Sequence, residues 1–189
     1  KNSGSKVTIN AGAADDTIAN SASTVSVFGG AGNDSIISTG GNKVTLHGGA
    51  GNDTLTGSAK AEVFQFRYDG GNDVITNFGT DDTLHIASGA YDTCYVDGND
   101  MIVAATSGTV TGTVRLKGLA NDQIKLKVGS AAVQTVFAFT NISNDTRGTA
   151  VAGTDYRDFI FNNANRVTVR GAGANDTIIN YGSTVSVDG

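Results

Sequence analysis

The chain has 189 residues, a formal net charge of −5, 26 glycines, no proline, no tryptophan and a single cysteine. The acidic balance argues against a nucleic-acid-binding surface, no apolar run is long enough to cross a membrane, and one cysteine cannot build a disulfide framework. Thr, Val, Ile, Asn, Gly and Asp prevail over the residues that favour helices, so we expect an all-β protein.

A turn rich in glycine and aspartate recurs along the first half of the chain. Residues 11–18 have the loose form A-G-A-A-D-D-T-I, residues 29–36 are G-G-A-G-N-D-S-I, and residues 48–55 are G-G-A-G-N-D-T-L. A shorter form, G-G-N-D-V-I, occupies residues 70–75. The last aspartates of these copies are spaced 18, 19 and 20 residues apart; they are Asp16, Asp34, Asp53 and Asp73. Such a regular period indicates a structural repeat.

Short segments in which apolar and polar residues alternate lie between the turns, at 7–9, 25–27 and 44–46. This alternation is typical of half-buried strands. One period therefore contains a turn, a strand, a second turn and a second strand, which is one coil of a solenoid. A coil of this kind buries its apolar face only by stacking on its neighbours. We predict a right-handed parallel β-roll over residues 1–86.

The glycine motif stops after residue 75, and the following segments predict a different structure. Residues 61–86 carry aromatic side chains that we expect to close the open end of the apolar stack, namely Phe64, Phe66, Tyr68 and Phe78. Residues 87–130 contain an Asp-Gly hairpin turn at 97–98 and further alternating segments, so we predict an antiparallel β cap there. Residues 131–152 are predicted to be a linker, with a joining strand at 133–139 and a loop from 141 to 153.

A longer repeat overlies the first. Residues 167–189 match residues 7–29 at an offset of 160, with 13 of the 23 positions identical. Within this match the turn G-A-G-A-N-D-T-I at 171–178 corresponds to the turn at 11–18, so Asp176 corresponds to Asp16. We predict that residues 153–189 begin another module and that the parent protein is a tandem array.

The glycine turns have the chemistry of a calcium site. Glycine permits positive φ, which lets the backbone direct carbonyl oxygens inward, and the final aspartate adds a carboxylate. Calcium takes about 6–8 oxygen ligands of these two kinds. A stacked column of carboxylates would repel itself without a cation, so we expect folding to be coupled to Ca²⁺ binding. The predicted ligand positions are Asp16, Gly30, Gly32, Asp34, Gly49, Gly51, Asp53, Gly71, Asp73 and Asp176.

These motifs resemble the RTX family, the calcium-binding β-roll repeats of secreted bacterial proteins. The family motif is G-G-x-G-x-D-x-U-x, with U a large aliphatic residue, and residues 29–36 and 48–55 match it fully. Residues 61–86 also resemble the element that ends RTX blocks. The chain departs from the family because its intervening half-turns, at 21–24 and 38–42, lack the aspartate. We therefore expect one column of ions, a metal-free opposite edge, and a partial or empty site at 11–18.

No catalytic motif stands out, and we do not expect an enzyme. The acidic pairs at 15–16 and 81–82 lie in or beside the repeat, where ligand or turn roles are favoured, and His47, His85 and Cys94 are expected to be structural or exposed. The favoured function is a calcium-binding structural module of a secreted or cell-surface bacterial protein, adhesin-like or filament-like. Its expected partners are calcium ions, neighbouring modules of the same or identical chains, and surface glycans or other cells.

Three alternatives stay open at this stage. The first is the export and folding module of a secreted RTX enzyme or toxin. The second is a polysaccharide-acting β-helix, which the aromatic content of 7% disfavours. The third is an ice-binding solenoid with flat threonine rows. It is disfavoured because Ala31 and Ala50, not threonine, follow the paired glycines.

Overall fold

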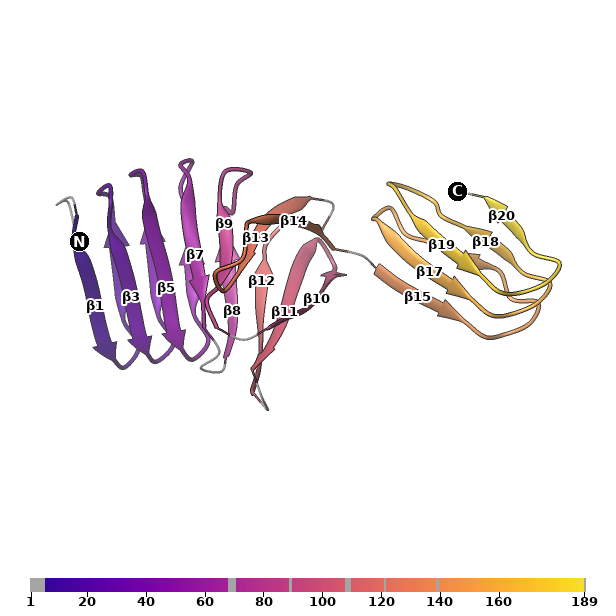
Figure 1. Cartoon of the computed structure of the whole chain (residues 1–189), viewed down its shortest axis with the longest axis horizontal. Helices are drawn as coiled ribbons and strands as arrows, with labels where there is room; N and C mark the ends of the chain where they lie inside the picture. Colours follow the sequence, from indigo (N-terminus) through magenta and orange to yellow (C-terminus); the bar gives the residue numbers. More distant parts are fainter. Residues whose placement is uncertain are drawn as a thin grey trace.

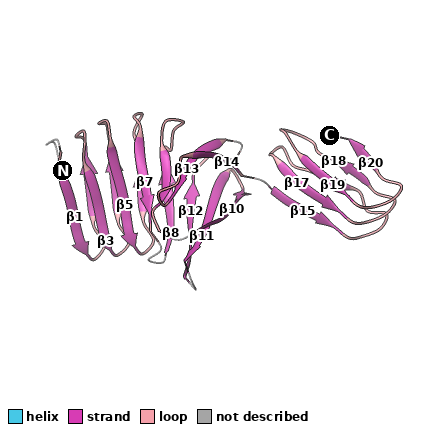
Figure 2. Cartoon of the chain, in the orientation of Figure 1, coloured by secondary structure: helices cyan, strands magenta, loops and turns pink. Residues whose placement is uncertain are grey.

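All the regular elements that the structure describes are β-strands, and most of them belong to stacked parallel sheets (Figures 1 and 2). The structure, a computed structural model, describes residues 6–67, 71–88, 90–107, 110–120, 122–138 and 140–188. Within these ranges there is no helix that is long and apolar enough to cross a membrane. Tyr68, one of the expected closing aromatics, and Gly70, the first glycine of the turn at 70–75, lie outside the described residues.

Two facing parallel sheets form the N-terminal roll. The first sheet contains β1 (Thr8–Ala13), β3 (Ser26–Ala31), β5 (Val44–Ala50), β7 (Glu62–Phe66) and β9 (Thr83–Ile86). The second contains β2 (Thr17–Asn20), β4 (Ser35–Ser38), β6 (Thr54–Thr56) and β8 (Gly71–Thr76). The chain alternates between the sheets, and like positions pair, as in Ile9 with Val27 and Val27 with Leu46. The prediction of a parallel β-roll is confirmed.

The core lies between the two sheets and consists of one apolar row from each. Val27, Leu46, Phe64 and Leu84 form the row of the first sheet, and all four are 0% exposed. Ile36, Leu55 and Ile75 form the facing row, at 0%, 3% and 1%. Burying one such side chain contributes about 1.5–3 kcal/mol, and each row forms only when neighbouring coils stack. The roll is therefore stabilised coil against coil.

An antiparallel cap continues both sheets beyond the roll, as the sequence predicted. Its strands are β10 (Ala90–Asp97), β11 (Asp100–Ser107), β12 (Val110–Leu116), β13 (Gln123–Val128) and β14 (Gln134–Phe137). β10, β11 and β12 pair antiparallel, and β12 lies parallel to β8 in the second sheet. β13 lies parallel to β9, and β14 closes the first sheet antiparallel to β13. The strand expected to join modules at 133–139 is thus the last strand of this sheet.

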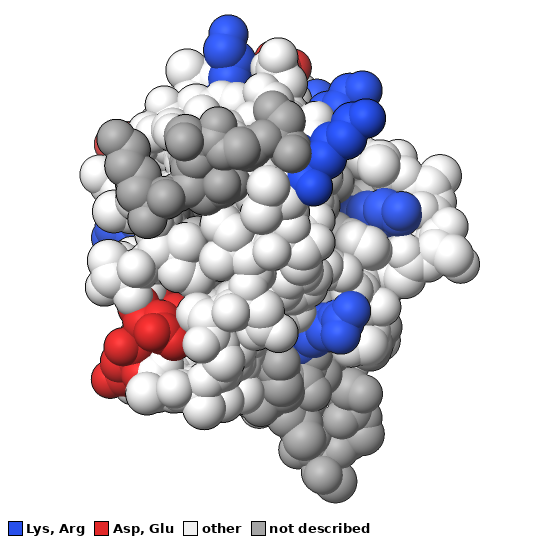
Figure 3. Space-filling model, turned by 90° about the vertical axis from the view of Figure 1, so that its left-hand side faces the viewer, with Lys and Arg blue, Asp and Glu red and all other residues white. Residues whose placement is uncertain are grey.

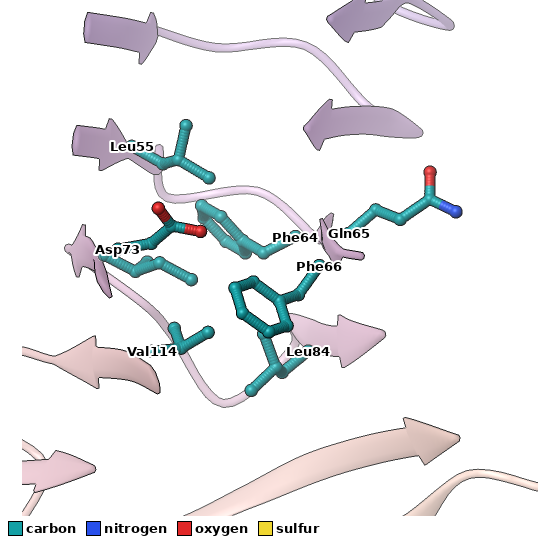
Figure 4. Close-up of a pocket in the computed structure, with 8 residues that line it drawn as sticks. Leu55, Phe64, Gln65, Phe66, Asp73, Leu84 and Val114 are labelled. Atoms are coloured by element: carbon teal, nitrogen blue, oxygen red, sulfur yellow. The ribbon is translucent and has the colours of Figure 1, made fainter. Parts of the chain in front are cut away.

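The described aromatic residues of 61–86 do not close an open end, so for them that expectation was wrong. Phe64, Phe66 and Phe78 are 0%, 6% and 7% exposed, and the rings of Phe64 and Phe78 lie 5.4 Å apart. Phe64 and Phe66 line an interior space together with Val114 of the cap strand β12 (Figure 4), and Phe78 packs against Phe64. The reason is that β12 and β13 extend the two sheets past them, so the stack continues beyond the aromatic layer.

A second, C-terminal roll begins at residue 140, earlier than residue 153 where the sequence suggested. One sheet contains β15 (Thr140–Asn144), β17 (Asp158–Asn162) and β19 (Thr177–Asn180). The other contains β16 (Val151–Ala152), β18 (Thr168–Arg170) and β20 (Ser186–Asp188). All neighbours are parallel, and Val151, Ile160 and Val169 form the centre of a separate core. The loop expected over 141–153 therefore holds the first coil.

The cap contacts the C-terminal roll at a small joint. The hydroxyl of Tyr156 donates to Asn99 Oδ1 at 2.5 Å, and the guanidinium of Arg157 lies 3.9 Å from the centre of the Phe137 ring. Asn99 and Phe137 belong to the cap, whereas Tyr156 and Arg157 precede β17. The chain as a whole is elongated, with the cap between the two rolls (Figure 1).

Candidate metal-binding edge

The four aspartates of the repeat line one edge of the N-terminal roll. The backbone N–H of Asp16 donates to Asp34 Oδ1 at 2.8 Å, and that of Asp34 donates to Asp53 Oδ1 at 2.8 Å. The N–H of Asp53 donates to Asp73 Oδ1 at 2.9 Å. Asp34, Asp53 and Asp73 are buried, at 2%, 1% and 5% exposed, and Asp16 is half-buried. We call this series the aspartate ladder. It fixes one carboxylate oxygen of Asp34, Asp53 and Asp73 against the preceding coil.

The second glycine of each pair lets adjacent coils approach closely. Gly30 has φ +122°, and a Cβ there would lie 1.9 Å from the carbonyl oxygen of Gly12. Gly49 has φ +120°, and its Cβ would lie 1.9 Å from Gly30 O. No other residue fits either constraint. All the glycines predicted as ligand positions have positive φ; they are Gly30, Gly32, Gly49, Gly51 and Gly71.

The first glycine of the pair has a different role, which the sequence did not reveal. A Cβ on Gly29 would lie 2.1 Å from Asp34 Oδ2 and 2.5 Å from the carbonyl oxygen of Gly48. A carboxylate oxygen and a carbonyl oxygen of the next coil therefore converge beside Gly29. The C-terminal roll repeats this arrangement, since a Cβ on Gly153 would lie 2.5 Å from Asp158 Oδ2 and 2.0 Å from Gly171 O. We call this the oxygen pair.

At Gly29 the oxygen pair is electrostatically incomplete, whereas at Gly153 the N–H of Thr154 donates to Asp158 Oδ2 at 2.6 Å. Among the described residues no donor reaches the buried Asp34 Oδ2, and the same is true of Asp16 Oδ2 in the first coil. A buried carboxylate oxygen without a donor is costly, and a neighbouring carbonyl oxygen adds repulsion. Such an atom calls for a water or an ion. Calcium binds carboxylate and carbonyl oxygens together, so the donor set fits this ion.

The remaining ligands of any such ion would come mostly from the backbone. Among the described residues, no three His, Cys, Asp or Glu side chains converge as a metal-binding group. The turns do supply carbonyls, because the glycines hold successive coils in contact. Acidic atoms also gather in one place on the N-terminal end of the roll, apart from the Lys and Arg side chains seen there (Figure 3). A concentration of negative charge attracts cations.

A second ladder runs beside the first, and sequence analysis missed it. The N–H of Asn33 donates to Asp15 Oδ1 at 2.6 Å, that of Asn52 to Asn33 Oδ1 at 2.9 Å, and that of Asn72 to Asn52 Oδ1 at 2.7 Å. Here each coil donates to the side chain of the coil before it, the reverse of the aspartate ladder. The recurring Asn-Asp dipeptide was the available signal. The two ladders together clamp each turn from both sides.

The aspartate ladder ends where the cap begins. β12 pairs with β8 so that Val114 stands opposite Asp73, and no further carboxylate follows in this register. Asp73 also lines the apolar space beside Phe64, Phe66 and Leu84 (Figure 4). The last turn therefore has a less polar environment than the turns at Asp34 and Asp53.

Two buried acids occupy the opposite edge, which was predicted to be metal-free. Glu62 is 2% exposed, and its carboxylate accepts from the hydroxyl of Ser38 at 2.8 Å and the N–H of Ser58 at 3.0 Å. Asp82 is 1% exposed and accepts from the N–H groups of Glu62 and Gly79 at 2.8 and 2.7 Å. Burial raises the pKa of Asp82 to about 6. Both oxygens of each carboxylate are thus hydrogen-bonded, in contrast to Asp34.

The predicted turn of the C-terminal roll, at residues 171–178, is a degenerate copy of the N-terminal turns. The N–H of Asp158 donates to Asp176 Oδ1 at 3.0 Å, so the ladder pattern recurs. Asp158, which was not predicted, is 0% exposed and also accepts from the N–H of Thr154 at 2.6 Å. Ala172 and Ala174 have φ of 77° and 62°, where glycine is favoured. This turn keeps the carboxylate and loses the relaxed backbone.

All the predicted ligand positions except Asp176 therefore lie together along one edge of the N-terminal roll. Asp176 lies in the C-terminal roll, in the equivalent place. Gly29, Gly48, Gly153 and Asp158 extend the set. Comparison of the chain with protein-family models, with curated proteins and with solved structures finds no match in any of the three.

Proposed function

We propose that the chain is a calcium-binding structural module of a secreted or cell-surface bacterial protein, of the adhesin or filament type. The observation that carries this proposal is the oxygen pair at Gly29. There a buried carboxylate oxygen of Asp34, which accepts no hydrogen bond from the residues that the structure describes, converges with the carbonyl oxygen of Gly48. A divalent cation that binds both oxygens would remove the cost of leaving them together.

Calcium would act between coils. Each ion would be held by the carboxylate of one turn and by carbonyls of that turn and the next, so binding would strengthen coil stacking. Because the unstacked chain does not assemble these ligands, binding free energy becomes folding free energy. Extracellular calcium modules typically have dissociation constants of about 0.1–1 mM. The chain would then be loosely folded in a low-calcium cell and rigid outside it.

The elongated arrangement supports the structural part of the proposal. The cap contacts both rolls, through β12 and β13 on one side and through Asn99 and Phe137 on the other. A series of such units would form a stiff spacer between the cell and whatever its ends bind. The resemblance of residues 29–36 and 48–55 to RTX turns agrees with secretion and with folding on calcium.

A calcium titration followed by far-UV circular dichroism tests the proposal. The native chain should gain β signal cooperatively between about 0.1 and 5 mM calcium. The double variant Asp34→Asn plus Asp53→Asn should need at least about tenfold more calcium, because it removes two buried carboxylates. The control Asp122→Asn plus Asp188→Asn makes the same change in charge at exposed positions off the ladder and should behave like the native chain. Equal calcium dependence in both variants would contradict the proposal.

A further inference from the structure

Strands β18, β19 and β20 occupy the same structural places as β1, β2 and β3. At the offset of 160, residues 168–170, 177–180 and 186–188 correspond to residues 8–10, 17–20 and 26–28. The pairing agrees with this correspondence. Val169 pairs with Val187 as Ile9 pairs with Val27, and in both cases the strands are parallel. The sequence repeat is therefore also a structural repeat.

The two sets of strands differ in what lies on their outer side. In the C-terminal roll, β16 pairs with β18 and β17 pairs with β19. Among the described residues, β1 and β2 are the outermost strands of their sheets and pair on one side only. The coil formed by β16 and β17 is thus a template, within the same molecule, for what fits the outer edge of β1 and β2.

The polar groups at this edge match that template. In the C-terminal roll, Asp176 Oδ1 accepts the N–H of Asp158 at 3.0 Å. Asp16 is the counterpart of Asp176, and elsewhere in the aspartate ladder Oδ1 accepts the N–H of the preceding coil, as Asp34 Oδ1 does from Asp16. An N–H donor from a preceding coil, placed as in Asp158, would reach this carboxylate.

The opposite turn gives the same result independently. Asn162 Nδ2 donates to Asn180 Oδ1 at 2.7 Å, and Asn180 in turn caps its own turn through the N–H of Gly182. Asn20, the counterpart of Asn180, makes the same cap with the N–H of Ala22. Its side chain thus has the orientation that continues an asparagine ladder from a preceding coil. Both turns of the first coil are shaped for stacking.

We infer that the outer edge of β1 and β2 is a coil-to-coil interface inside a longer roll. Its partner is a coil of the kind formed by residues 140–166, contributed by a preceding repeat of the same type. The roll then crosses the boundary of the sequence repeat, since residues 140–166 of one repeat stack on residues 7–86 of the next. The unit that folds is offset from the unit that repeats in sequence. This inference goes beyond calcium binding and does not depend on it.

An in-phase extension tests this inference. Residues 140–160 are repeated ahead of Lys1 in the full chain, which preserves the offset of 160, and amide hydrogen exchange is followed by mass spectrometry. A peptide spanning β1 and β2 should exchange on the order of tenfold more slowly than in the unextended chain, because edge strands become internal. The control carries the same 21 residues in scrambled order and should leave the exchange of β1 and β2 unchanged.

The experiment is run with saturating calcium and with excess chelator. Selective protection by the in-phase extension in either condition supports the inference, so failure of the calcium proposal does not decide it. Equal exchange in the in-phase and scrambled chains under both conditions would overturn it. So would protection of β1 and β2 in the unextended chain that is lost on dilution, because a second copy would then fill the edge. As a further check, Asp16→Ala should lower the folding equilibrium constant of the extended chain about fivefold more than that of the unextended chain.

Discussion

The N-terminal and C-terminal rolls have the same architecture but differ in their turns. The N-terminal turns at Asp34 and Asp53 are preceded by two adjacent glycines, whereas the C-terminal roll has Gly153-Thr154 and Gly171-Ala172 at the same places. The first glycine, beside the oxygen pair, is kept in both rolls. The second, which only lets coils approach closely, is replaced. The coil therefore tolerates a poorer turn backbone, and the position that both rolls retain is the one that makes room for the carboxylate.

The edge opposite the aspartate ladder also differs between the two rolls. In the C-terminal roll it is a neutral asparagine ladder, in which Asn144 Nδ2 donates to Asn162 Oδ1 at 2.8 Å and Asn162 Nδ2 donates to Asn180 Oδ1 at 2.7 Å. In the N-terminal roll it ends in the buried acids Glu62 and Asp82. The stability of the N-terminal roll should therefore depend on pH along an edge where that of the C-terminal roll does not.

The largest expected effect comes from comparing two glycine-to-alanine variants. One variant places a Cβ against the adjacent coil, and the other only strains a backbone with positive φ. Gly49→Ala should destabilise the N-terminal roll by at least about 3 kcal/mol, because the new Cβ meets a backbone oxygen of the adjacent coil. Gly12→Ala is the matched control, since Gly12 has φ +108° but nothing within 4 Å of a Cβ. It should cost only about 1 kcal/mol of backbone strain. Urea unfolding measures both, and equal losses would show that close coil approach is unimportant.

The asparagine ladder gives the next effect. Asn162 is 0% exposed and lies in the middle of the ladder. Asn162→Ala removes the hydrogen-bond partner of Asn144 and Asn180 and should lower the free energy of unfolding by about 2 kcal/mol. Asn180→Ala removes an exposed terminal member and should cost less than about 1 kcal/mol. Region-resolved hydrogen exchange of the C-terminal roll measures both. A similar cost at the two positions would mean that the ladder does not act as a continuous unit.

The contrast between the acidic and neutral edges predicts a pH effect of about 1 kcal/mol. The pKa of Asp82 is raised to about 6 in the folded chain by burial, above its unfolded value, so protonation favours the folded state. The contribution of Asp82 to stability should therefore rise as pH falls from 7 to 5. Burial and the nearby Arg67 lower the pKa of His47, which opposes this trend over the same range.

The Asp82 effect is isolated by comparing the native chain with Asp82→Asn. Urea unfolding at pH 7 and at pH 5 gives the difference in free energy between the two proteins. The native chain should gain about 1 kcal/mol relative to the variant at the lower pH. A difference that does not change with pH would show that Asp82 titrates normally and that its burial carries no linkage.

The smallest expected effect comes from restoring glycine in the turn of the C-terminal roll. Ala172→Gly with Ala174→Gly should stabilise the C-terminal roll by about 0.5–1 kcal/mol, because glycine relieves positive φ at both positions. Ala152→Gly, in strand β16, is the control and should destabilise by about as much. A loss of stability in the double variant would mean that the alanine methyl groups make contacts that outweigh the strain.

Much of the fold could be predicted because each repeat carries two signals, the alternation of apolar and polar residues and the regular spacing of the aspartates. The alternating segments at 25–27 and 44–46 identified strands, and the spacing of Asp34 and Asp53 identified coils. The first coil of the C-terminal roll was missed because residues 140–152 lack the repeated glycine-aspartate motif and hold only Gly148 in a turn. Its strands are recognisable only once β17 and β18 provide a surface for stacking. The aromatic layer was misplaced because sequence does not show that β12 and β13 extend the sheets past it.

The candidate site was predictable in its residues and less so in its geometry. The Asp and Gly positions followed from the motif, since few other residues combine positive φ with a carboxylate at fixed spacing. The division of work between Gly29 and Gly30 did not follow, because it depends on which atoms of the adjacent coil face each Cα. The ladder formed by Asp15, Asn33 and Asn52 was missed for the same reason, as its hydrogen bonds join residues 18 or 19 positions apart.

The most direct test of calcium binding is to locate the ion in a crystal. Crystals grown with calcium, with anomalous scattering measured at long wavelength, would show whether a cation lies at the oxygen pair. A bound calcium ion should give a peak within about 2.3–2.6 Å of both Asp34 Oδ2 and Gly48 O. The peak should be absent from crystals of Gly29→Ala, in which the new Cβ would occupy that space. A calcium-grown crystal with no peak there, and with a water in its place, would contradict calcium binding at this edge and leave the glycine turns as purely structural.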